Sequence, residues 1–347
     1  MANVDFCGIG KVAIDAKDPL ANSHYLEGAT EKTRARWVSS LLDSGNLRAR
    51  AAGLFLQGAF TTDYESEQPD TQEARDELVR LAVGAADPVI YSMAVYRCNG
   101  YSADSSAACR QVSWDGWARM DPDNAVPWLV LAANAQSSND PAAGAEAFNH
   151  AAKARQLDGY VDSLFAIAET ELPKDASALE RSFFAVQVIG AEAATVAPQY
   201  SIASKRCSLD AMKESGVKQQ CNDVAELMVG KGKTVLDFAV GESIGKRVGW
   251  PAARLDALEQ EKNAMLASVM QVAPMGDPQP WSCTSVARLN DWADLRSQLG
   301  EIGAARVLRE RSGESISELA RKHTEAMERI FREARESAQG QSPSEDP

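Results

Sequence analysis

Cysteine is the residue type of this chain with the clearest capacity for chemistry. Two of its six cysteines, Cys98 and Cys109, are eleven positions apart, and Cys207 and Cys221 are fourteen apart. In each pair the first cysteine follows an arginine at the expected end of one helix, and the second opens the next helix after a polar, glycine-containing loop. We therefore predict two disulfides, each pinning two antiparallel helices at their joined ends.

A third bridge is predicted between the two remaining cysteines, Cys7 and Cys283. Two alternatives stay open. Zinc binding is disfavoured because the sequence has no C-x-x-C pair and because His24, His150 and His323 lie far from any cysteine. Six buried, unpaired thiols are the other alternative. We predict disulfides and no metal site.

The disulfide prediction carries an expectation about location, because disulfides persist in oxidising compartments. A bacterial periplasm or the cell exterior is therefore expected. The segment from Met1 to Asp5 has neither the basic start nor the apolar run of a secretory signal. We expect that a signal peptide was removed and an initiator Met added. If Met1 is native, the cytoplasm becomes the favoured compartment.

Two glycine-rich segments resemble nucleotide-binding loops without meeting their requirements. The segment from Gly230 to Thr234 would need a glycine at 227, where Leu227 stands. The segment from Gly8 to Ala13 follows too few residues for the strand that a dinucleotide fold requires. We interpret the first as a helix end with glycine breaks. No cofactor is predicted.

No sequence signature of catalysis is present. The chain contains neither G-x-S-x-G nor H-E-x-x-H. We therefore predict no catalytic residue and a protein that is not an enzyme. A hydrolase whose Ser, His and Asp come from distant segments remains an alternative, because a catalytic set need not be contiguous.

The histidines fit structural roles better than catalytic ones. His323 lies on an apolar helical stripe with Leu319 and Ile330, which is typical of a packing residue. His150 is expected on a solvated helix face, with a place in a binding groove as the alternative. Residues 314–338 also offer i,i+4 pairs such as Glu318 with Lys322, which favours a solvated cap helix over a partner-binding or dimer helix.

Composition and charge limit the possible partners. The 347 residues include 36 Lys plus Arg and 49 Asp plus Glu, a formal charge of -13. An acidic chain repels phosphate backbones, so nucleic acid is not expected as a partner. A protein or peptide, basic in character, is a better match, and the acidic stretch 61–70 is a candidate surface for it. No apolar run is long enough for a transmembrane segment.

Helical periodicity dominates the chain, and no convincing strand is seen. Asp87-Pro88 and Asp140-Pro141 each place an N-cap residue before a proline at the first helical position. Helices are predicted over 33–42, 46–60, 71–84, 88–98, 109–120, 124–137, 141–156, 159–171, 175–195, 198–207, 217–231, 234–248, 251–271, 284–299, 301–311 and 314–338.

The chain is predicted to divide by composition and periodicity. The expected parts are an irregular N-terminal segment (1–29), a helical array (30–272), a Pro-rich linker (273–283), C-terminal helices (284–338) and a disordered tail (339–347).

Residues 121–155 carry the most specific pattern. Trp128, Leu131 and Ala132 stand at helical spacing on a first helix, and the second helix carries small, aromatic and small residues at Gly144, Phe148 and Ala151. The unit resembles the tetratricopeptide repeat, with Ala135 and Gln156 as departures where an aromatic and a proline are common.

The resemblance implies a fold and a function. Small residues let the paired helices approach closely, and Trp128 and Phe148 would fill the gap between neighbouring hairpins. Because one hairpin cannot bury its own apolar face, neighbours must stack on it. We therefore predict an all-α fold of stacked antiparallel hairpins, a disulfide-braced solenoid that binds a protein or peptide. An immunity or inhibitor protein that blocks a toxic enzyme is a narrower version.

Overall fold

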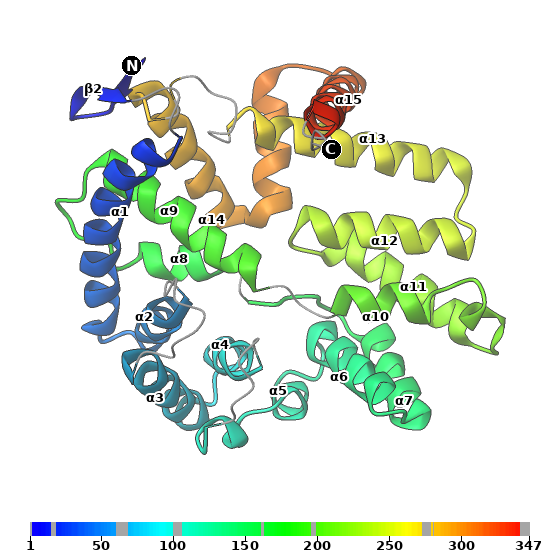
Figure 1. The fold of residues 1–347 in the computed structure, drawn as a ribbon. Coiled ribbons are helices and arrows are strands. Elements are labelled where there is room, and N and C mark those ends of the chain that lie inside the picture. The colour runs from blue at the N-terminus through cyan, green and yellow to red at the C-terminus, as the bar shows by residue number, and fades with distance from the viewer. Residues whose placement is uncertain are drawn as a thin grey trace, which may run out of the picture.

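In the residues that it describes, the computed structural model consists mainly of helices, with one short β-hairpin near the N-terminus (Figure 1). It describes residues 2–14, 19–59, 69–99, 106–160, 163–195, 199–272, 279 and 281–340. The predicted all-α class is confirmed. Within these residues no helix is long and apolar enough to cross a membrane.

The first half of the chain forms a curved row of helices in which each packs against the next. The row consists of α1 (Pro19–Leu42), α2 (Leu47–Ala59), α3 (Pro69–Ala85), α4 (Pro88–Cys98), α5 (Trp114–Met120), α6 (Ala125–Ser137) and α7 (Pro141–Lys153). One continuous apolar core follows the row, with Trp37, Phe148 and Trp117 among its fully buried side chains.

The row is interrupted after α7 by two helices that turn back to its beginning. α8 (Leu164–Glu169) packs against α2, and α9 (Ala178–Ala194) packs against α1. The row then resumes, because α10 (Gln199–Arg206) packs on α6 and α11 (Val217–Lys231) packs on α7. In Figure 1 the chain curves from α1 at the left, below α9, and up the right side. The packing of α8 and α9 departs from a simple solenoid.

The C-terminal helices close the molecule. They are α12 (Val235–Val248), α13 (Ala252–Met270), α14 (Cys283–Ser312) and α15 (Ile316–Gly340). α14 breaks at Gly300, whose φ of 73° is open to glycine at little cost, so the predicted end of one helix before residue 301 agrees with the structure. The first part of α14 packs against α9 and thereby joins the last third of the chain to the first.

The N-terminal segment was wrongly predicted to be irregular. Strands β1 (Ala2–Phe6) and β2 (Gly10–Ile14) form an antiparallel hairpin, and α1 already begins at Pro19. The hairpin is held from outside, because Phe6 packs with Leu179, Phe183 and Val286. A strand pair this short is marginal alone, so its sequence pattern is weak.

Several predicted boundaries also need correction. The predicted helix 109–120 is split into a 3₁₀ turn, Cys109–Gln111, and α5, which Ser113 caps by accepting the N–H of Gly116. The predicted helix 159–171 shrinks to α8. Of the predicted linker 273–283, residues 273–278 and 280 lie outside the described residues, and Cys283 already belongs to α14. Residues 339 and 340 of the predicted tail belong to α15, and residues 341–347 lie outside the described part.

Candidate functional site

The three predicted disulfides are all present. Cys98–Cys109 joins the end of α4 to the 3₁₀ turn, and Cys207–Cys221 joins the end of α10 to α11; their Cα atoms are 5.4 and 5.6 Å apart. No cysteine is free, so the free-thiol and cysteine–zinc alternatives are wrong. The second bridge links two helices as predicted, whereas Cys109 does not open a helix of the row: it lies in the 3₁₀ turn before α5.

The third bridge, Cys7–Cys283, has a Cα separation of 4.5 Å and fastens the β-hairpin to the start of α14. The backbone N–H of Cys7 also donates to the carbonyl of Trp281 at 2.9 Å. The bridge therefore joins the first and last parts of the described chain.

Helices α6 and α7 form the hairpin predicted from the repeat pattern. Asn124 caps α6 by accepting the N–H of Val126, and Asp140 caps α7 by accepting the N–H of Ala143 at 3.0 Å. Phe148 and Ala151 are fully buried, as expected for packing positions. A Cβ on Gly144 would meet the Cβ of Ala135 at 3.6 Å, so the alanine that replaces the usual aromatic lies at the close approach of the two helices.

Trp128 does not fill the gap between hairpins as expected. It is half-buried, as is Leu131, and its ring stacks on His150 of the same hairpin with centroids 4.2 Å apart. Its Nε1 donates to the carbonyl of Pro122 at 3.0 Å. Of the two predicted aromatic residues, Phe148 is the one that is fully buried.

A polar cluster that was not predicted from the sequence joins the two ends of this hairpin. Asp121 accepts from Tyr160 Oη at 2.9 Å and from Gln156 Nε2 at 2.9 Å. The fully buried Asn124 donates to Asp121 and to the carbonyl of Asp158, both at 2.8 Å. Burial raises the pKa of Asp158. Gln156, a departure from the repeat pattern, belongs to this cluster, and that departure was its only sequence signal.

A hollow of about 150 Å³ opens beside the hairpin, between α6, α7 and α10. Its floor includes Ala132 and Gly144, two of the predicted repeat residues, together with Ile202. Four polar residues, Gln136, Asn139, Asp140 and Arg206, contribute to the lining as well. The complete lining is Ala132, Gln136, Asn139, Asp140, Pro141, Gly144, Ala145, Ile202 and Arg206. The hollow has the mixed apolar and polar lining that suits a side chain of a peptide.

Charge at this hollow is mixed. Arg206 immediately precedes the Cys207 bridge and pairs with Glu214 at 3.3 Å. The carboxylate of Asp140 is engaged as the cap of α7. The ion pair with Glu214 orients the Arg206 side chain, and the cap orients that of Asp140.

A second hollow, of about 250 Å³, lies between the first helices of the row. Leu42 and Leu54 supply apolar lining, and Glu73 and Glu77 supply carboxylates, of which Glu77 is paired with Arg50. The predicted acidic surface, 61–70, adjoins these helices in sequence. Residues 61–68 lie outside the described part of the chain.

Buried ionic groups lie between α9, α12 and α14. Glu192 of α9 pairs with Arg296 of α14 at 2.5 Å and accepts the N–H of Phe165 at 3.1 Å. Asp237 accepts from Tyr200 Oη at 2.9 Å, and Glu301 accepts the N–H of Val235 at 3.1 Å. Each carboxylate has a protein donor, so this cluster is structural in character.

Burial sets the proton affinity of these carboxyls. It raises the pKa of Glu192, an effect that the nearby Arg296 partly offsets, and it raises the pKa of Asp237 and of Glu301. All three groups therefore bind protons more tightly in the folded chain than in water.

The two glycine-rich segments have structural roles. Lys231 ends α11, and Thr234 caps α12 in a capping box with Asp237, so the segment from Gly230 to Thr234 is a junction between helices, as interpreted from the sequence. The segment from Gly8 to Ala13 is the turn and second strand of the β-hairpin. Neither segment joins a strand to a helix as a nucleotide-binding loop does.

The histidines do not gather. His150 is exposed on α7, His323 is half-buried on α15, and His24 lies in α1 with a side chain outside the described set. Among the residues that the structure describes, no group of three His, Cys, Asp or Glu could hold a metal ion.

Comparisons with known proteins add no assignment. A scan against protein-family models, a search of curated proteins and a search of solved structures each found no match. The resemblance to the tetratricopeptide repeat therefore rests on the residues of α6 and α7.

Proposed function

We propose that this chain is a non-catalytic helical-repeat protein that binds a protein or peptide outside the cytoplasm, in the bacterial envelope or exterior. The observation that carries the proposal is the hollow between α6, α7 and α10, which lies on the repeat unit and is lined by its own small residues, Ala132 and Gly144. Its volume of about 150 Å³ matches one side chain of a partner rather than a whole small-molecule substrate.

The rigidity of this site supports binding. The caps Asn124 and Asp140 fix the two helices, and the polar cluster around Asp121 fixes the ends of the hairpin. The Cys207–Cys221 bridge fixes α10 beside it. A surface that is already ordered loses little conformational entropy when a partner docks, and it therefore binds more tightly for the same contacts.

Charge and redox state support the class of partner and the location. A formal charge of -13 attracts a basic protein or peptide over a distance and speeds its association. Three disulfides with no free cysteine are compatible with an oxidising, extracytoplasmic compartment.

The test is a peptide-display selection against the full chain, followed by affinity measurement with two matched variants. Gln136→Trp places a large ring at the hollow from an exposed position of α6. Asn134→Trp makes the same kind of change at an exposed position of α6 that does not line the hollow. We expect the selected peptides to share a motif and to bind Gln136→Trp about tenfold more weakly, or worse, with Asn134→Trp unchanged.

Two results would count against the proposal. One is a selection that yields no common motif and no peptide whose binding can be measured. The other is a set of peptides that bind both tryptophan variants equally, since those peptides would not use the hollow. Thermal unfolding of the two variants checks that both are folded.

A further inference from the structure

Helix α15 carries an apolar stripe that the rest of the described chain covers only in part. Near its start, Leu319 is fully buried and packs with Ala264 and Ala267 of α13. About three turns along the same helix, Ile330 is 43% exposed and Phe331 is 59% exposed. The stripe therefore continues past the surface that buries its first half.

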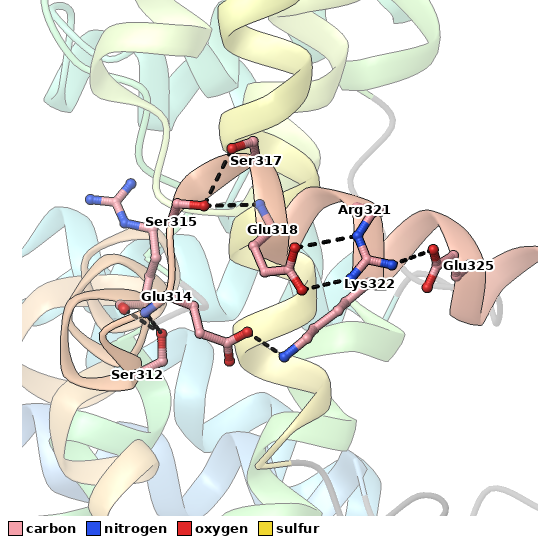
Figure 2. Close-up of polar contacts among 9 residues, drawn as sticks. Ser312, Glu314, Ser315, Ser317, Glu318, Arg321, Lys322 and Glu325 are labelled. Atoms are coloured by element: carbon pink, nitrogen blue, oxygen red, sulfur yellow. Dashed lines mark hydrogen bonds and ion pairs between the residues drawn. The ribbon is translucent and has the colours of Figure 1, made fainter.

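The charged side chains of α15 also differ between the first and second halves of the helix. In the first half Arg321 is paired with Glu318 and Glu325, and Lys322 is paired with Glu314 (Figure 2). The i,i+4 pair that the sequence suggested, Glu318 with Lys322, is replaced by these.

The second half is different. Its charged residues are all exposed, and no ion pair is formed among them within the described part of the chain; they are Glu328, Arg329, Arg332, Glu333, Arg335 and Glu336. The second half of α15 therefore exposes both charged and apolar side chains to solvent on the same two turns.

We propose that this second half is a self-association surface, and that its occupant is a second copy of this chain bound antiparallel to it. The two-fold axis passes between residues 330 and 331, so Ile330 of each copy faces Phe331 of the other. The interface is then isologous, with the same patch used on both copies. The inference is independent of the proposed peptide-binding function, because the hollow lies on α6, α7 and α10.

The charges argue for a second copy over other occupants. In this register Glu328 and Arg335 lie on the same side of the stripe. Glu328 of one copy therefore faces Arg335 of the second copy, and Arg335 of the first faces Glu328 of the second. Arg329 and Glu333 are related in the same way on the opposite side. Both pairings occur twice by symmetry, which antiparallel packing of one helix with itself permits.

The net charge of the helix agrees with this choice. α15 contains five acidic and five basic residues in a chain whose formal charge is -13, so it is a neutral element on which two acidic molecules can meet. A strongly basic partner or an anionic membrane would find no matching excess of charge on it. Figure 1 places α15 at the edge of the molecule, where a second copy can approach.

The first test is analytical ultracentrifugation of the full chain from low micromolar to several hundred micromolar concentration. We expect a reversible monomer–dimer equilibrium. Phe331→Glu should weaken it at least about tenfold, because it places a charge at the centre of the seam. Leu209→Glu is the matched control, since Leu209 is 68% exposed outside α15, and it should leave the equilibrium unchanged.

The second test separates an antiparallel pair of identical helices from general stickiness. Glu328→Arg and Arg335→Glu should each weaken dimerisation about tenfold, and the double exchange should restore it, because each charge again faces its opposite. A chain that stays monomeric at every concentration would overturn the proposal. So would an exchange that fails to restore association, or a Leu209→Glu effect as large as that of Phe331→Glu.

Discussion

The ion pair of Glu192 with Arg296 offers the sharpest test of how this fold is held together. The two side chains are 2% and 7% exposed, and they join α9 to α14, two helices far apart in the sequence. We expect Glu192→Gln to destabilise the chain. The amide keeps an oxygen for the N–H of Phe165 but leaves the charge of Arg296 buried without its counter-charge.

The size of the loss follows from the burial. Breaking a buried pair by removing one charge costs about 3–5 kcal/mol, and we expect the lower end because the hydrogen bond to Phe165 is kept. An unfolding entropy of about 2 cal/mol/K per residue gives this chain about 0.7 kcal/mol/K, so the midpoint of thermal unfolding should fall by about 4 °C. Arg296→Met added to Glu192→Gln should recover at least half of the loss, because no unpaired charge then remains.

Differential scanning calorimetry at neutral pH measures these changes with the disulfides intact. Asp291→Asn is the matched control, since Asp291 pairs with Arg311 at 2.6 Å on the exposed side of the same helix. Its cost should stay below about 1 kcal/mol. If Glu192→Gln lowers the free energy of unfolding by no more than Asp291→Asn does, the buried ion pair adds no more stability than an exposed one. That result would refute the reasoning.

Three further predictions concern the pH dependence of stability and the packing of helices. Burial raises the pKa of Glu301, so the folded chain gains stability from its proton as pH falls and loses that contribution as pH rises through the raised pKa. Glu301→Gln should therefore make the unfolding midpoint depend less on pH above the ordinary pKa of a glutamate, with the larger gain at the higher pH; an unchanged slope would contradict this. Gly144→Ala should raise stability by about 0.5–1 kcal/mol, because its Cβ meets only ordinary contacts. Gly245→Ala should lower it by about 1–3 kcal/mol, because its Cβ would collide with the ring of Trp250. A higher unfolding midpoint for Gly245→Ala would show that the packing around α12 is looser than the structure indicates, and a lower midpoint for Gly144→Ala would show that α6 and α7 approach more closely than it indicates.

Most helices of the row could be predicted because their limits are marked by neighbouring residues. Asp87 and Pro88 set the start of α4 at the predicted residue, and α11 spans the predicted 217–231. A cap or a proline acts on the next few N–H groups, so its effect can be read locally. Where no such signal stood, as at residues 159 and 160, the predicted helix was too long.

The candidate site was only partly accessible to sequence reasoning. The small residues Ala132 and Gly144 were identified from the repeat pattern, but the hollow that they line also needs Ile202 and Arg206, which come from α10. No spacing in the sequence connects α10 with α6, because α8 and α9 intervene. The cluster around Asp121 was missed for a different reason. Each of its members is a common polar residue that, taken by itself, indicates no site.

By itself the sequence determined what depends on neighbours along the chain. That includes the helical class, most helix limits, the two disulfides across short loops and the close approach of α6 to α7. The third disulfide was inferred only because two cysteines were left over. Tertiary structure alone decided that α9 returns to α1, that α14 packs on α9 with Glu192 against Arg296, and that residues 2–14 fold as a hairpin. The two helix contacts join surfaces more than a hundred residues apart, and the hairpin, although its strands are neighbours, is held by the packing of Phe6 on Leu179 and Val286. The burial that makes these contacts favourable exists only once the whole chain has folded.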